Sequence, residues 1–156
     1  MKHFRLLLGV VLLSVIIGGI GIVTNKTKLI SPNPQLNAYQ VLTIQLQSLQ
    51  HNKKLGNNFG IKQTYEFAHP NNKALTGPIH NFIEMLETES YSILLNHSQT
   101  SITTIHQDPI HEVFEVTVTK DDKKATFIWT ILALQNEQQD IYWYTASVMP
   151  FNVPTI

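Results

Sequence analysis

The stretch FEVTVTKDDKKATFIWTILAL, residues 114–134, decides the fold. Its first half alternates apolar and polar residues with a period of two, which predicts a strand with one buried face. The charged run at residues 121–124 predicts a hairpin turn, and residues 127–134 behind it are apolar on both faces. The stretch therefore predicts two antiparallel strands, of which the second is central in a sheet.

Two further segments have the composition of strands. Residues 141–149 are rich in Tyr, Trp and Thr, and they end before Pro150, which has no N–H for a β-ladder. Residues 136–140 form the polar turn that precedes them, and residues 101–106 are an earlier candidate strand. We therefore expect the C-terminal part of the chain to form an antiparallel sheet.

The preceding part of the domain has helical periodicity. From Ala38 to His51 one apolar stripe recurs every three or four residues, and residues 59–67 can form a second helix that ends before Pro70. A third helix follows, with Thr76 as its predicted N-cap and Pro78 in its first turn. Helices followed by strands predict an α+β fold in which a curved antiparallel sheet wraps the helices.

The N-terminal segment differs from the rest of the chain. Residues 6–23 contain no charge and approach the roughly 20 residues that span a bilayer core. We predict a transmembrane anchor there, between a short tail at 1–5 and a proline-containing linker at 24–37. A cleaved signal peptide is the main alternative, although no Ala-x-Ala site follows. The chain is thus predicted to be a single-pass membrane protein with its domain on the extracytoplasmic side.

Composition excludes several classes of function. From Leu29 onward seven lysines face eleven acidic residues, a net charge of about −4, so the domain has no basic stripe for nucleic acid. The only arginine is Arg5, and the chain has no cysteine, which excludes disulfides, thiolate metal sites and a Cys nucleophile. No Walker loop or G-x-S-x-G motif is present either.

Several motifs occur in an order that resembles the DUF4864 family of bacteria and plants. They are Gln45–Leu49, Asn72–Pro78, Tyr91–His97, Trp129 and Trp143–Val148. The resemblance covers roughly residues 41–149, nearly the whole of the domain that we predict at 38–150, and a short tail at 151–156 follows the domain. It implies an NTF2-like (SnoaL-like) cone, in which helices pack into the concave side of the sheet and leave an open mouth. It implies no established activity.

Aromatic and polar residues in this region suggest a binding pocket. Trp129, Trp143 and Thr145 are expected to point into one cavity, because residues two apart share a strand face. Asn72 would orient a ligand at the mouth, with Thr76 and His97 nearby. The alternatives are a packed aromatic core, a turn and helix cap at Asn72–Pro78, and a buried or capping His97.

Two chemical constellations compete with this interpretation. Glu66 with His69 or His97 is the acid and base pair of a possible cavity enzyme. The run His106-Gln-Asp108-Pro-Ile-His111 brings two imidazoles and a carboxylate together, but its Asp-Pro pair and flanking strands favour a hairpin turn over a metal site. No metal or cofactor is therefore predicted.

The sequence thus predicts a membrane-anchored NTF2-like module that binds a small apolar molecule or an envelope protein partner, without catalysis. A cavity enzyme is the first alternative. A structural module whose exposed sheet face docks another envelope protein is the second.

Overall fold

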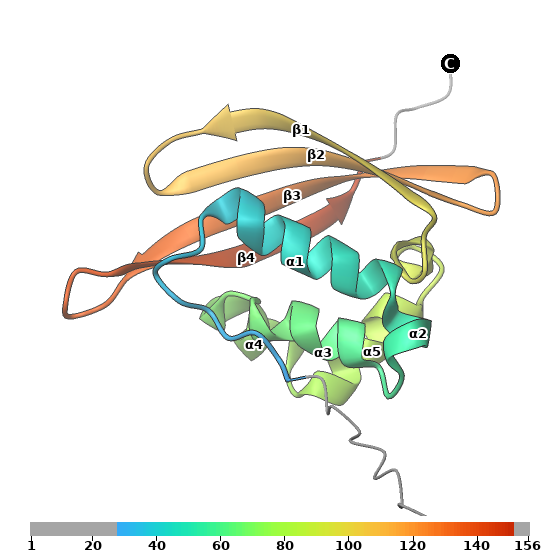
Figure 1. Ribbon diagram of the computed structural model, residues 1–156, viewed down its shortest axis with the longest axis horizontal. Helices are drawn as coiled ribbons and strands as arrows, with labels where there is room; N and C mark the ends of the chain where they lie inside the picture. The colour runs from blue at the N-terminus through green and yellow to red at the C-terminus, as the bar shows by residue number, and fades with distance from the viewer. Residues whose placement is uncertain (1–27, 152–156) are drawn as a thin grey trace, which may run out of the picture.

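The hairpin around residues 114–134 lies in the middle of a four-stranded antiparallel sheet with the order β1-β2-β3-β4 (Figure 1). The computed structural model describes residues 28–151. Helices precede the strands, and Figure 1 shows them together on one side of the twisted sheet. The elements are α1 (Ala38–Gln50), α2 (Asn52–Leu55), α3 (Phe59–Glu66), α4 (Pro70–Thr76), α5 (Ile79–Glu87), the 3-10 helix η1 (Ser92–Leu94), β1 (Gln99–Gln107), β2 (His111–Lys120), β3 (Lys123–Gln135) and β4 (Ile141–Pro150).

The fold prediction, an NTF2-like cone preceded by one transmembrane helix, is wrong as stated. The structure is an α+β fold with a four-stranded antiparallel sheet. No helix within residues 28–151 is long and apolar enough to cross a membrane, since even α1 has 13 residues where about 20 are needed. The segment predicted as an anchor, residues 6–23, lies outside the described residues.

The first helix forms as its apolar stripe predicts. Asn37 caps it with a capping box, in which the Asn37 side chain accepts from the Gln40 backbone and the Gln40 side chain accepts from the Asn37 backbone. Its buried face packs against α3 and the inner face of the sheet, and it consists of Ala38, Val41, Leu42, Gln45, Leu46 and Leu49.

The prediction of Thr76 as a helix N-cap is wrong. Thr76 is the last residue of α4, and its hydroxyl donates to Asn72 Oδ1 at 3.2 Å. Gly77, with φ of +82°, ends α4, and Pro78 precedes α5 without a side-chain cap. Because an Asn-Asn-rich segment has no apolar stripe, the periodicity of the sequence did not indicate α4.

The described part of the predicted linker is docked onto the domain. The Ile30 backbone N–H donates to Gln63 Oε1 at 2.7 Å, and Gln63 Nε2 donates to the Ile30 carbonyl at 2.8 Å. Gln63 is itself buried in α3. Two hydrogen bonds to a buried amide hold this segment more closely than a free spacer would be held.

The sheet places alternate residues on its two faces. Phe114 pairs with Trp129 and Val116 with Phe127, and these four side chains lie in the core between the sheet and the helices. The turn between β2 and β3 has Asp121 and Asp122 at φ of +48° and +62° inside a Lys120–Lys123 closing pair, the backbone of a tight two-residue hairpin. Irregularities in register occur between Thr104 and His106 and between Thr130 and Ile131.

Candidate functional site

A pocket of about 290 Å³ lies between α4, α5 and the end of β4. A short parallel bridge positions α4 beside β4, because the His69 N–H donates to the Thr145 carbonyl and the Thr145 N–H donates to the Phe67 carbonyl, each at 2.8 Å. The pocket is lined by Leu49, Thr64, Asn72, Leu75, Phe82, Met85, Leu86, Tyr91, Leu94, Trp129, Ala146, Ser147 and Val148. Its wall is therefore mainly apolar.

The indole of Trp129 is held by a buried chain of hydrogen bonds. Its Nε1 donates to Thr145 Oγ1 at 3.1 Å, and Thr145 Oγ1 donates to Gln45 Oε1 at 2.6 Å. Gln45 Nε2 then donates to the Thr64 carbonyl at 3.0 Å. This Trp129–Thr145–Gln45–Thr64 relay satisfies every polar group it contains, so the ring is fixed where it lines the pocket.

The predicted pocket residues are separated by the register of the sheet. Thr145 belongs to the relay and does not line the pocket. Trp143 pairs with Ala133, four residues along β3 from Trp129, which corresponds to about 13 Å of strand. The side chain of Trp143 packs half-buried against another part of the core. The two indoles therefore do not share this cavity.

Asn72 lines the pocket, as the sequence predicts, and Thr76 holds its side chain. The Thr76 hydroxyl donates to Asn72 Oδ1, while Asn72 Nδ2 has no hydrogen-bond partner among residues 28–151. Within the described residues this amide group can therefore donate a hydrogen bond to a ligand. Thr76 itself does not line the pocket.

His97 is a buried structural residue outside the pocket. Its Nδ1 lies 2.7 Å from the Leu94 carbonyl, which can only accept, so Nδ1 carries the proton. In the neutral ring Nε2 therefore accepts from the Thr100 hydroxyl at 2.6 Å. Burial lowers the pKa of His97 below its ordinary value, with smaller effects from the Leu94 hydrogen bond and neighbouring charges. The neutral ring ties η1 to β1.

The acid and base candidates near α4, Glu66 and His69, are not brought together at the pocket. His69 Nδ1 accepts from the Asn71 N–H at 3.1 Å and so caps α4. The Glu66 carbonyl accepts from Lys73 Nζ at 3.0 Å. No hydrogen bond joins Glu66 to His69 among the described residues, and neither side chain lines the pocket.

Most of the pocket wall consists of residues that the sequence did not indicate as site residues, and one of them, Leu75, stands at the rim. Leu75 is 89% exposed, the highest value among the large apolar side chains of the described chain. A lone leucine in the polar segment 70–76 was the available signal, because a helix with no buried residue has no use for it in packing.

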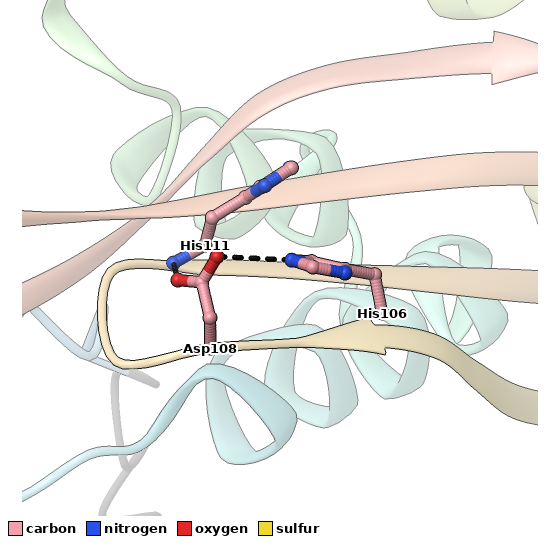
Figure 2. Close-up of side chains that lie close together, drawn as sticks. All are labelled: His106, Asp108 and His111. Atoms are coloured by element: carbon pink, nitrogen blue, oxygen red, sulfur yellow. Dashed lines mark hydrogen bonds and ion pairs between the residues drawn. The ribbon is translucent and has the colours of Figure 1, made fainter.

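Two other regions of the described chain are candidate sites: a surface groove and a side-chain cluster at the β1–β2 hairpin. A larger hollow of about 760 Å³ between η1 and the β2–β3 turn has a charged, exposed lining that includes Glu89, Lys120 and Lys123, so it is an open surface groove. His106, Asp108 and His111 meet at the β1–β2 hairpin (Figure 2), where their ligand atoms all lie within 4.8 Å of one another. None of these three residues lines the pocket beside β4.

Comparison of the chain with models of known protein families, with curated proteins and with solved structures finds no match. The resemblance to the DUF4864 family, the membrane location and the envelope partner therefore stay predictions. The functional argument rests on the geometry of the pocket and of the hairpin.

Proposed function

We propose that this domain binds a small, neutral, mainly apolar molecule in the pocket between α4, α5 and β4, and that it does so without catalysis. The observation that carries the proposal is the apolar pocket itself, which is backed by the indole of Trp129 and bordered by the exposed Leu75. An apolar concavity with a few polar groups is the usual form of a small-molecule site, because a bound ligand removes its apolar surface from water.

The size and chemistry of the pocket define the ligand. A volume of about 290 Å³ is at the lower end of ordinary ligand sites, which span about 300–1,000 Å³. Phe82, Met85 and Trp129 supply aromatic and thioether surface, and a methionine adapts its shape to different ligands. The free Asn72 amide donor adds one polar contact, so we expect a ligand with a single acceptor such as a carbonyl or ether oxygen.

The lining favours binding over acid–base chemistry. The described residues that line the pocket include no carboxylate, imidazole or ammonium group. The Tyr91 hydroxyl donates to the Val148 carbonyl at 3.1 Å and is already engaged. A general acid or base must lie within hydrogen-bond reach of the reacting group, and no contact on this wall supports the cavity-enzyme alternative.

The proposal is tested by fluorescence titration of the full chain with the neutral apolar probe N-phenyl-1-naphthylamine. We expect saturable enhancement at one site per chain, weakened several-fold by Leu75→Ser and abolished by Ala146→Phe, which places a ring in the cavity. Ile110→Ser is the matched control, because Ile110 is a similarly exposed side chain (66%) away from the pocket. Equal binding by all four proteins would rule the pocket out.

A further inference from the structure

The β1–β2 hairpin carries a second site that is independent of the pocket. Figure 2 shows His106, Asp108 and His111 converging at the hairpin, with His106 Nε2 2.9 Å from Asp108 Oδ2. The two imidazole rings have centroids 5.0 Å apart. One donor atom from each of the three residues lies within 4.8 Å of the other two. Three side chains thus offer two nitrogens and one oxygen to the same volume.

A β-bulge puts His106 in this position. Thr104 pairs with Phe114, but the next pair is His106 with Val113, so Ile105 is an extra residue on β1. Without the extra residue His106 would stand opposite Glu112, on the face of β2 that packs toward the core. The bulge moves it to the outer face, which it shares with His111 two residues from Val113. Bulges commonly re-aim a side chain in this way.

The turn between the strands aims the carboxylate. Asp108 Oδ1 accepts from the Ile110 N–H at 2.9 Å and from the His111 N–H at 2.7 Å, an Asx turn that fixes the side chain. Oδ2 is left facing His106. Oδ1 thus stabilises the turn, while Oδ2 is held in a position from which it can coordinate a metal ion.

The turn chemistry explains Asp108 Oδ1 but not the two imidazoles. A hairpin of this length is closed by backbone bonds and by the Asx turn alone. His106 and His111 are accessible to solvent, and the His111 ring makes no hydrogen bond within residues 28–151. One exposed and one half-buried imidazole beside an oriented carboxylate are instead typical of a metal-binding donor set.

We infer that His106, Asp108 and His111 bind one divalent transition-metal ion, with Zn²⁺ the natural probe. Two imidazoles and one carboxylate suit this borderline ion, whose bonds to nitrogen and oxygen are about 2.0–2.2 Å. At the tetrahedral angle these bonds bring ligand atoms to about 3.4 Å from one another. His106 and Asp108 already lie within this separation, and rotation of the His111 ring, which makes no hydrogen bond within residues 28–151, closes the remaining gap. Water completes the coordination, because the three side chains leave at least one position open.

Isothermal titration of the full chain, purified without a histidine tag, tests the inference. We expect one Zn²⁺ per chain with micromolar affinity at pH 7.5, and no heat of binding from Mg²⁺, which prefers oxygen ligands. His111→Ala and Asp108→Asn should each weaken Zn²⁺ binding at least tenfold. The asparagine keeps the Oδ1 acceptor of the turn and removes the charge, so the hairpin itself survives.

His80→Ala is the matched control, because His80 is an exposed histidine on α5 outside the cluster. It should leave the Zn²⁺ affinity unchanged. Visible absorption of the Co²⁺-substituted chain gives a second readout, since ligand-field bands should be lost in His111→Ala and kept in His80→Ala. No Zn²⁺ binding by the wild-type chain, or equal binding by wild type and a His106→Ala/His111→Ala double variant, would overturn the site.

Discussion

The pocket beside β4 takes its walls from residues that run from Leu49 to Val148, whereas the metal cluster takes its three ligands from one hairpin. The pocket is apolar, and the buried relay behind it has every polar group paired. The cluster is polar, exposed and held by local turn chemistry. A site that depends on the whole core should fail when packing fails, while a site built on one turn should tolerate loss of its side chains without loss of the fold.

The largest change in the free energy of unfolding is expected where α1 and α3, which both contribute to the pocket wall, approach each other closely. A side chain at Gly60 would run into the backbone carbonyl of Ser48, where α1 and α3 meet. Gly60→Ala should therefore lower the free energy of unfolding by about 3 kcal/mol, measured by urea denaturation. Gly56→Ala is the matched control: the space around Gly56 is open, so the substitution costs only the backbone strain of its φ of +73°, on the order of 1–3 kcal/mol. If both variants lost the same free energy of unfolding, the close contact between α1 and α3 would not explain the effect of the substitution at Gly60.

The next largest effect concerns the relay behind Trp129. Gln45→Leu keeps the approximate volume but removes the acceptor of the Thr145 hydroxyl and the donor to the Thr64 carbonyl. The Thr145 hydroxyl would lose its acceptor, and the Thr64 carbonyl would keep only the Phe67 N–H, so the free energy of unfolding should fall by about 1–3 kcal/mol. Gln47→Leu, at an exposed position of the same helix, should change it by less than about 0.5 kcal/mol. Similar values for both variants would mean that the relay does not stabilise the core.

A smaller change in the free energy of unfolding should accompany the protonation of His97 as the pH falls. Its pKa is lowered in the folded state, so between that value and the ordinary 6.5 the unfolded chain binds more protons. The contribution of His97 to stability is therefore complete above about pH 6.5 and is lost as the pH falls toward the folded-state pKa. Urea denaturation at pH 7.5 and 5.5 measures the loss. It should persist in His80→Gln and shrink in His97→Gln; an unchanged loss in His97→Gln would refute the assignment.

The smallest effect belongs to the hairpin. Without metal, His106→Ala should change the free energy of unfolding by less than about 0.5 kcal/mol, because its side chain is exposed. With Zn²⁺ at one hundred times its dissociation constant, the wild-type chain should gain about 2.7 kcal/mol and the variant almost nothing. Thermal denaturation with and without Zn²⁺ makes the comparison. A large loss in the metal-free variant would show that the hairpin supports the core, contrary to the contrast drawn between the two regions.

Much of the secondary structure follows from local patterns. The stripe that begins at Ala38 predicts α1, and the charged run at 121–124 predicts the β2–β3 turn, as found. The stripe is reliable because it reports which face of the helix avoids water. The charged run is reliable because a segment of consecutive charged side chains stays in water, as a hairpin turn does. Thr76 fails as an N-cap because the adjacent segment forms its own helix, α4, which ends at Gly77.

The candidate sites could be predicted only in part. Asn72 and Trp129 were recognised as pocket residues, and both line the cavity. The sequence predicts Trp143 on the same strand face as Trp129, but the β3–β4 register places the two indoles at different points along that face. His106 and His111 were visible as a pair in the sequence, yet nothing local indicated that a bulge would bring them to the same face.

By itself the amino-acid sequence determined that helices precede strands, the position of the β2–β3 turn and the negative net charge from Leu29 onward, since each depends on neighbouring residues or on composition. Only the tertiary structure decided which indole faces the pocket, where Asn72 is held and how the two histidines meet. The placement of the indoles and of the histidines depends on strand register, since a shift of one residue moves every following side chain to the other face of the sheet. The placement of Asn72 depends on how α4 packs beside β4.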